Sequence, residues 1–176
     1  MRRILLLLMV SAISGWASGE LSNRRAPGFS LPDSRLNQVD LADYRGKVVV
    51  LEIMMTTCPH CEKLAPILET VQRRYAGRVQ VLSVVNPPDT TQTVGQYISK
   101  HSLSFPVLFD CGQVAGSYMR ATPQKPSFDV PHLFLIDQNG QIRNDFGYSV
   151  LTIGIFEGKD LFTEVEKLLG PTVPKK

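Results

Sequence analysis

The chain has 176 residues, of which 43% are hydrophobic and 20% charged, a composition that is ordinary for one folded globular domain. Its formal net charge of +3 falls to about +1 when residues 1–19, with their two arginines, are left out. Because no basic stripe remains, the charge balance argues against a protein that binds nucleic acid.

The first residues have the layout of a secretory signal peptide. Two arginines precede the apolar run 4–10, and small residues follow it. We expect residues 1–19 to be removed by cleavage after Ala17 or Gly19. The alternative is an uncleaved anchor, but the apolar run is well short of the about 20 residues that span a bilayer. We therefore predict export to the periplasm or cell envelope of a bacterium, where disulfides persist.

A domain is expected over residues 26–170. Residues 20–25 are interpreted as a polar join, and residues 26–47 have short alternating pieces broken by turn residues. This pattern predicts a β-hairpin followed by a short turn of helix. Residues 48–55 then form an apolar run interrupted only by Glu52, which is typical of a strand buried on both faces.

The next stretch predicts a strand–helix–strand unit. Apolar residues recur from residue 61 to residue 76 at helical spacing, with Pro66 inside the helix and Gly77 at its end. Residues 79–85 are the following strand. Two strands joined by a helix at this spacing should be parallel.

The remaining residues complete a central mixed β-sheet with helices on both faces, an α/β protein. We expect helices at 91–101, 112–119 and 159–170, strands at 105–110, 132–137 and 141–148, a loop at 120–130 and a loose tail at 171–176.

The chemistry is expected at Cys58 and Cys61, which are separated by two residues. Such a pair can coordinate a metal ion, form a structural disulfide (an inert staple) or exchange electrons as a redox-active dithiol. The three cysteines of the chain are too few for a disulfide framework, and a zinc site needs four ligands, usually with a second paired half. Cys58 would lie at a helix N-terminus, where the amide N–H groups and the helix dipole favour a thiolate. We therefore expect Cys58 to attack and Cys61, one turn later, to resolve.

Three neighbours are expected to tune this pair. Pro59 stiffens the first turn of the helix. His60 either stabilises the thiolate or is an exposed loop residue without redox effect. Glu52 is a carboxyl in an apolar strand, so burial should raise its pKa and allow it to take the proton of Cys61. The alternative for Glu52 is a place at the edge of the sheet, facing water.

These residues resemble the thioredoxin superfamily, and within it the exported TlpA/ResA-like thiol-disulfide oxidoreductases with an AhpC/TSA-like thioredoxin domain. The resemblance covers residues 26–170 and rests on matches that recur in order. They are the N-terminal hairpin, the redox-active pair Cys58–Cys61, Pro66 in the helix, the strand "FPVLFD" of an inserted helix–strand segment, and "VPHLFLIDQNGQI". Glu52 matches the buried acid of thioredoxin itself.

The resemblance implies further roles. Pro131 would follow a cis peptide bond and face the Cys pair, and the backbone of Val130 would pair with a substrate strand; the alternative is an ordinary trans proline. Thr57 stands where the family usually has tryptophan, so the substrate rim formed with Pro59 and His60 should differ in shape. The loop 120–130 would either flank the site or be plain surface.

Cys111 and His132 are left over. Cys111 is expected to be a small buried hydrophobic residue, with a second redox role as the alternative. His132 is expected to have a structural role, with its side chain pointing away from the site or into the sheet.

The resemblance implies a thiol-disulfide oxidoreductase that acts as a monomer, without metal or organic cofactor, in cellular redox homeostasis. Its partners would be the thiols and disulfides of exported proteins, for instance apocytochrome c, and a membrane electron donor. One rival is a thiol peroxidase with antioxidant activity, although Thr56 and Thr57 crowd Cys58 and the matching proline is absent. The other is a copper-delivery protein, which would have three residues between its two cysteines, whereas this chain has two.

Overall fold

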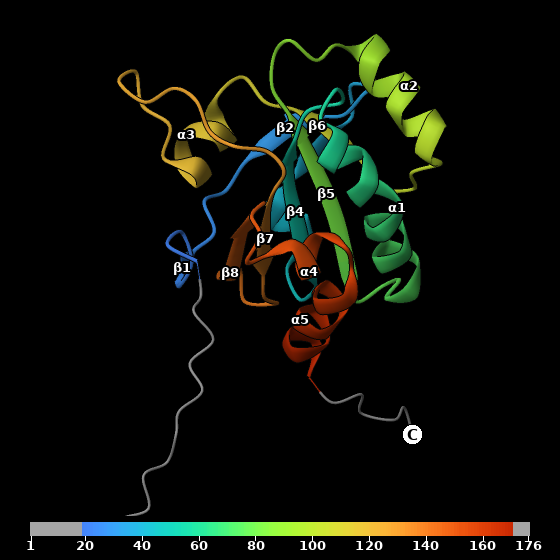
Figure 1. The fold of residues 1–176 in the computed structure, drawn as a ribbon, viewed down its shortest axis with the longest axis vertical. Coiled ribbons are helices and arrows are strands. Elements are labelled where there is room, and N and C mark those ends of the chain that lie inside the picture. The colour runs from blue at the N-terminus through green and yellow to red at the C-terminus, as the bar shows by residue number, and fades with distance from the viewer. Residues whose placement is uncertain (1–18, 171–176) are drawn as a thin grey trace, which may run out of the picture.

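The computed structural model of the chain describes residues 19–170 as a central six-stranded sheet with helices on both faces and a separate two-stranded hairpin (Figure 1). The expected signal peptide, apart from its last residue, and the expected tail lie outside the described residues. The sheet has the strand order β1-β8-β7-β4-β5-β6. Its strands are β1 (Arg24–Arg25), β4 (Val48–Met54), β5 (Val79–Val85), β6 (Val107–Phe109), β7 (His132–Ile136) and β8 (Gln141–Gly147).

The sheet is mixed, as predicted. β4 pairs parallel with β5, and β5 pairs parallel with β6, whereas β4–β7, β7–β8 and β8–β1 are antiparallel. The parallel pair β4–β5 is joined by a helix, as a parallel connection requires. The helices are α1 (Pro59–Arg74), α2 (Thr91–His101), α3 (Gln113–Met119), α4 (Ile153–Phe156) and α5 (Lys159–Leu169).

Strand β4 is the centre of the molecule, and every one of its residues is buried. Successive side chains of a strand point to opposite faces of the sheet. Leu51 and Ile53 pack in a core with α3 and the N-terminal hairpin, whereas Val48 and Val50 pack in a second core with α1, α4 and α5. Glu52 has the parity of the second set, so it lies on the face of β4 that α1 covers.

The segments expected on each side of this centre are confirmed. The N-terminal hairpin consists of β2 (Ser30–Pro32) and β3 (Gln38–Asp40) and is followed by the short helix η1 (Leu41–Tyr44). The inserted helix–strand segment is α2 with β6, which lies between β5 and α3 along the chain. Asp40 caps η1 and Thr90 caps α2, so polar side chains at these two helix starts satisfy free N–H groups.

The prediction of a plain polar join at residues 20–25 is wrong, because Arg24 and Arg25 form β1 and pair with Ile142 and Gln141 of β8. The Arg24 guanidinium also donates hydrogen bonds to the carbonyls of Leu21, Ser117 and Tyr118. The strand is held by backbone pairing and by the hydrogen bonds of Arg24 to these carbonyls. Neither kind of contact produces an apolar pattern in the sequence, so the strand could not be predicted.

Helix α4 was not predicted either, since four residues are too short for a periodic signal. It packs its buried Ile155 and Phe156 into the core beneath α1. Within residues 19–170, no helix has the length and apolar character that crossing a bilayer demands.

Candidate active site

Cys58 is the N-cap residue of α1 and is half-buried. Strand β4 ends at Met54, and a turn closed by a hydrogen bond of 3.1 Å from the Cys58 N–H to the Met55 carbonyl leads into the helix. Pro59 occupies the first helical position, where its missing N–H costs nothing. The Cys58 sulfur accepts a hydrogen bond of 3.4 Å from the Cys61 N–H. The sulfur therefore sits among the free amide groups at the helix start.

Cys61 lies one turn further on and is fully buried. Burial raises the pKa of the Cys61 thiol well above its ordinary value, and the nearby charge of Glu52 raises it further. The two sulfurs thus differ in access, with Cys58 reachable from solvent and Cys61 enclosed. A buried thiol of this kind needs a proton acceptor before it can act as a nucleophile.

Glu52 is such an acceptor within the protein interior, with only 1% of its surface exposed. Its Oε2 accepts a hydrogen bond of 2.5 Å from the Ser83 hydroxyl, and its Oε1 has no hydrogen-bond partner among the described residues. Burial raises the pKa of Glu52 to about 7, against the effect of the Ser83 bond. The alternative of a sheet-edge glutamate facing water is wrong, because β4 has partner strands on both sides.

Val130 and Pro131 meet the Cys pair from the loop before β7. The Val130–Pro131 peptide bond is cis, so the trans alternative for Pro131 is wrong. The Cys58 thiol donates to the Val130 carbonyl at an S···O distance of 3.7 Å. Residues 72 positions apart are thereby brought together, and the backbone of Val130 lies beside the more exposed sulfur.

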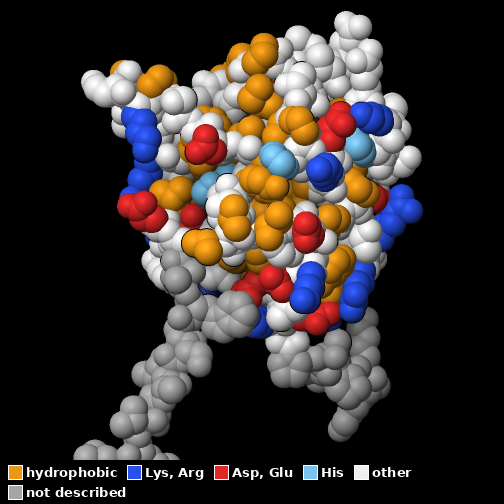
Figure 2. All heavy atoms as spheres, in the orientation of Figure 1, with side chains coloured by type: hydrophobic (Ala, Val, Ile, Leu, Met, Phe, Trp, Pro, Cys, Tyr) orange, Lys and Arg blue, Asp and Glu red, His pale blue; other side chains and the backbone are white. Residues whose placement is uncertain are grey.

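The rim of the site contains Thr57, Pro59 and His60. Thr57 and Pro59 are exposed, and His60 is half-buried in the first turn of α1. The His60 ring stacks on Tyr148, with ring centroids 3.9 Å apart and planes 24° from parallel, so the alternative of an exposed loop residue is wrong. Hydrophobic side chains gather at the centre of this face, around α4 (Figure 2). Val150, Leu151 and Ile153, at and just before the start of α4, are exposed large apolar residues.

The expectation that Cys111 is buried is wrong, because its side chain is exposed. The buried place in this bend is taken by Asp110, whose carboxylate accepts the N–H groups of Val114 and Ala115 at the start of α3. Cys111 instead lines a cavity of about 740 Å³ that also borders Met55 and Val130.

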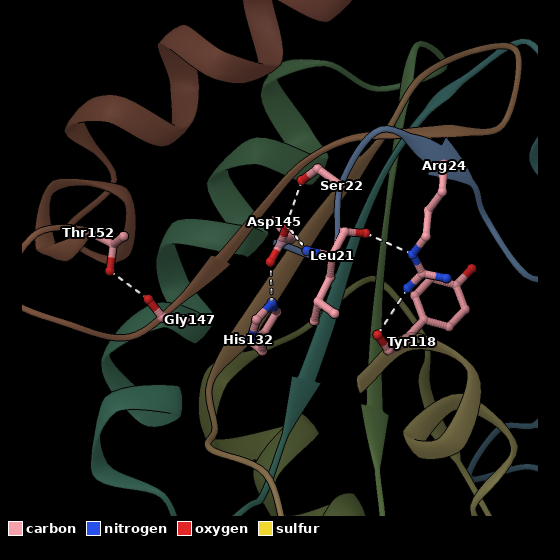
Figure 3. A network of polar contacts seen from close by, with 8 residues as sticks. All are labelled: Leu21, Ser22, Arg24, Tyr118, His132, Asp145, Gly147 and Thr152. Carbon is pink, nitrogen blue, oxygen red and sulfur yellow. Dashed lines mark hydrogen bonds and ion pairs between the residues drawn. The ribbon is translucent and has the colours of Figure 1, made fainter. Parts of the chain in front are cut away.

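His132 has the structural surroundings that were expected (Figure 3). Its buried ring makes a contact of 3.2 Å through Nε2 with Oδ2 of Asp145. Oδ1 of Asp145 accepts hydrogen bonds from the Leu21 N–H at 3.1 Å and from the Ser22 hydroxyl at 2.5 Å. Burial opposes ionisation of Asp145, but these hydrogen bonds prevail and lower its pKa. Asp145 thus joins the N-terminal segment to the strand that begins beside Pro131.

Two residues of the site were missed from the sequence. Asp89 accepts hydrogen bonds from the Thr56 N–H and the Thr56 hydroxyl, and the Tyr97 hydroxyl donates to the Cys61 carbonyl. Asp89 lies in the loop before α2 and Tyr97 lies in α2, so both reach the turn of the Cys pair from more than 30 positions along the chain. No motif or periodicity marks such a contact, and only the buried tyrosine on one face of α2 hinted at packing.

Among residues 19–170, histidine, cysteine, aspartate and glutamate side chains do not gather in groups of three or more that could hold a metal ion. The remaining histidines and Cys111 are therefore not assembled around Cys58 and Cys61 as zinc ligands would be. The geometry of the site is that of a dithiol whose two sulfurs differ in exposure, placed over a buried acid and beside a cis-proline loop.

The model of the AhpC/TSA family matches residues 23–145, well over half of the chain. The chain belongs to the AhpC/TSA family. The thiol-disulfide oxidoreductase ResA of Bacillus thuringiensis (strain Al Hakam) is 27% identical over 150 residues, which are 80% of this chain and 83% of that protein. ResA of Geobacillus kaustophilus (strain HTA426) is 31% identical over 119 residues, 67% of this chain and 64% of that protein.

The same relationship is visible in three dimensions. The crystal structure of a thiol:disulfide interchange protein of the thioredoxin family from Chlorobium tepidum TLS superimposes with a TM-score of 0.70. It covers 84% of this chain and 97% of that chain at 19% identity, so it establishes the fold. This member of the AhpC/TSA family has a thioredoxin-like fold, and it is an enzyme of the thiol-disulfide oxidoreductase class.

Proposed function

We propose that this protein is exported and that it exchanges its Cys58–Cys61 dithiol and disulfide with protein substrates through a mixed disulfide. In this proposal residues 1–19 are the signal peptide, residues 26–170 are the working domain, and the compartment is the bacterial periplasm or cell envelope. The substrates are thiols and disulfides of exported proteins, apocytochrome c among them. A membrane electron donor reduces the Cys58–Cys61 disulfide again.

The single observation that carries the proposal is the unequal placing of the two sulfurs. Cys58 is half-buried at the start of α1 and touches the Val130 carbonyl, whereas Cys61 is enclosed next to Glu52. A nucleophile has to be accessible, and a resolving thiol has to wait within reach. An inert staple has no need of this asymmetry or of a buried acid beside it.

The exchange balances as follows when a substrate is reduced. The Cys58 thiolate attacks one sulfur of the substrate disulfide, the substrate S–S bond breaks, and the second substrate sulfur leaves as a thiolate and takes up a proton. Glu52 accepts the proton of Cys61. The Cys61 thiolate then attacks the Cys58 sulfur, which breaks the mixed disulfide, closes the enzyme disulfide and releases the first substrate sulfur as a thiolate that takes up a proton. Substrate oxidation is the same sequence in reverse.

The docking groove in this proposal is formed by the loop before β7 and the start of α1. The backbone of Val130, preceding the cis bond to Pro131, lies where an extended substrate segment would pair next to Cys58. Thr57, Pro59 and His60 form the opposite rim and select what can approach the sulfur.

Substitution of Cys58 by serine tests the proposal. Cys58→Ser should abolish turnover of a protein disulfide, and Cys61→Ser should trap a mixed disulfide that mass spectrometry of the unreduced complex detects. Cys111→Ser is the matched control and should retain turnover, because the mechanism does not use this thiol. Turnover retained by Cys58→Ser would overturn the assignment.

Two further measurements separate the rivals and the direction of exchange. A peroxide-consumption assay with the same three variants identifies a thiol peroxidase if peroxide is consumed faster than protein disulfides, and copper titration at the sulfur-to-metal absorption band identifies a copper carrier. The reduction potential of the Cys58–Cys61 couple, measured against glutathione, tells an oxidant from a reductant. The thioredoxin and DsbA extremes differ by about 150 mV.

A further inference from the structure

Helix α2 and the loop before it hold the turn that carries both redox cysteines. The turn from Thr56 to Cys61 joins the end of β4 to α1 and is bounded by two contacts from the inserted segment. Asp89 binds its first residue, and the Tyr97 hydroxyl binds the carbonyl of its last residue at 2.9 Å. These contacts lie outside the groove that the proposed function assigns to substrate.

The contact at Thr56 is made twice. Oδ2 of Asp89 accepts the Thr56 N–H at 3.0 Å, while its Oδ1 accepts the Thr56 hydroxyl. Oδ1 also accepts the Thr93 hydroxyl at 3.0 Å, and Thr93 completes the capping box of α2. The Asp89 carboxylate therefore joins Thr56 to the first turn of α2. Hydrogen bonds to a carboxylate are stronger than those to a neutral acceptor.

The contact at Cys61 is buried. Tyr97 is only 4% exposed and packs in a cluster with Met54, Cys61 and Val94. Burial, followed by the charge of Glu52, raises the pKa of Tyr97, so its hydroxyl keeps its proton and acts as a donor to the Cys61 carbonyl. The backbone of the resolving cysteine thus has a partner outside its own helix.

The turn needs such outside support because α1 contains Pro66. Proline has no N–H, so the Glu62 carbonyl one turn earlier has no helical donor at that level, and the proline ring crowds this carbonyl. The first turn of α1 is therefore joined to the rest of the helix by fewer backbone hydrogen bonds than an ordinary turn. Asp89 and Tyr97 supply bonds at the two ends of that loosened turn.

We propose that Asp89 and Tyr97 are positioning residues through which the inserted segment sets the redox equilibrium of the Cys58–Cys61 pair. Both contacts are made while the two sulfurs are free thiols. The two contacts hold the turn in the arrangement of the dithiol, in which the Cys58 thiol donates to the Val130 carbonyl and accepts the Cys61 N–H. Closing the disulfide removes the thiol proton of the first of these bonds and so disturbs this arrangement. We therefore expect the two contacts to favour the dithiol. The inference rests on the proposed function, since it concerns the same redox couple.

Replacement of the Tyr97 hydroxyl tests this. In Tyr97→Phe the equilibrium of the Cys58–Cys61 couple with glutathione should move about fivefold toward the disulfide, as expected for one hydrogen bond lost from the dithiol form alone. Asp89→Ala should move it in the same direction. Thr56→Val, which removes only a hydroxyl that Asp89 binds, repeats the test with a smaller change if Asp89→Ala does not fold.

Tyr118→Phe is the matched control. The Tyr118 hydroxyl also donates to a carbonyl, that of Pro27 at 2.7 Å, but in the core on the other face of the sheet. It should lower the free energy of unfolding about as much as Tyr97→Phe and leave the glutathione equilibrium unchanged. An unchanged equilibrium in Tyr97→Phe, or a shift toward the dithiol, would overturn the inference. A wild-type protein that forms no Cys58–Cys61 disulfide in glutathione would contradict the proposed function instead.

Discussion

Glu52 is an ionisable residue in the middle of β4, a strand in which every residue is buried. Burial makes its ionised form unfavourable, and this is the physical reason why we propose it as a proton acceptor. An ionised carboxylate without full hydrogen bonding is expensive in the protein interior. Within residues 19–170 only one of its oxygens has a partner, Ser83. Burial raises the pKa of Glu52 to about 7, so the protonated form is favoured below about that pH. A group that takes or gives a proton near neutral pH is what the enclosed Cys61 thiol needs.

The pH dependence of stability should report this residue. The pKa of Glu52 is higher in the folded protein, at about 7, than its ordinary value of 4.5, so the folded state holds the proton more tightly. Stability from this residue is therefore complete below about pH 4.5 and is lost as pH rises to about 7, by up to about 3 kcal/mol. In Glu52→Gln that slope should disappear, as measured by urea unfolding of the reduced protein between pH 5 and pH 8.

Glu62→Gln is the control for this experiment, because Glu62 is a partly exposed carboxyl in the first turn of α1 that pairs with Lys100. It should keep the wild-type slope between pH 5 and pH 8. A Glu52→Gln protein with the wild-type slope would mean that another group takes up the proton.

Sequence reasoning at this scale succeeded where a residue type is unusual in its local pattern. A glutamate in an apolar strand, two cysteines at a helix start and a proline before a strand are visible without a structure. Cys111 was misjudged because its neighbour Asp110 takes the buried place as a helix cap. Tyr97 and Asp89 were missed because their contacts depend on how α2 lies against α1, which no local pattern encodes.

At the scale of elements, the N-terminal segment depends on one carboxylate. Asp145 of β8 binds the Leu21 N–H, the Ser22 hydroxyl and the His132 ring, and β1 follows directly. With only two residues, β1 has too few ladder bonds to hold by itself. Besides its backbone pairing with β8, this edge of the sheet is therefore held by the side-chain contacts of Asp145 and Arg24.

Asp145→Asn should loosen this segment without unfolding the domain. The neutral amide accepts weaker hydrogen bonds and presents N–H groups where the carboxylate accepted them, so we expect a loss of about 1–3 kcal/mol in local stability. Amide hydrogen exchange of residues 21–25 should accelerate, while that of β4 should not. The exposed Asp43→Asn is the control and should change neither. Unaltered exchange in Asp145→Asn would show that Arg24 alone holds β1.

Helices and strands with a long, regular pattern of apolar residues could be predicted from the sequence, and short ones could not. β4 is a continuous buried run, β5 is buried apart from the half-buried Gln80, and α2 and α5 are amphipathic, so each was expected close to its observed bounds. β1 and α4 are too short for a pattern, and tertiary contacts alone form them. The inserted segment was expected as an element, but its contacts with the Cys pair were not.

At the scale of the whole molecule, the six-stranded sheet separates two large cores. One contains Phe134 with α3 and the hairpin, and the other contains Leu161 with α1, α4 and α5. A smaller third cluster contains Met54 and Cys61. Every residue of β4 is buried, and residues 48 to 51 alternate between the two large cores, so neither core can be lost without exposing the other side of the same strand. The domain should therefore unfold as one unit.

Substitutions on each side of the sheet test this cooperativity. Phe134→Ala should cost about 3–5 kcal/mol and Leu161→Ala about 2–5 kcal/mol, because each leaves a cavity in a close-packed core. Urea unfolding followed by far-UV circular dichroism and by tyrosine fluorescence should give one coincident transition for both variants. A second transition in either variant would mean that the two cores are independently stable.

The pairing of β1 with β8 places residues from opposite ends of the chain side by side, Arg24 against Ile142. During synthesis β1 emerges long before its partner β8, so residues 19–25 have nothing to pair with until β8 has arrived. Until then this segment is an extended chain that a protease can cut. Once the sheet closes, Leu21 and Ser22 are hydrogen-bonded to Asp145 and the neighbouring strand is paired, so the same segment should resist proteolysis.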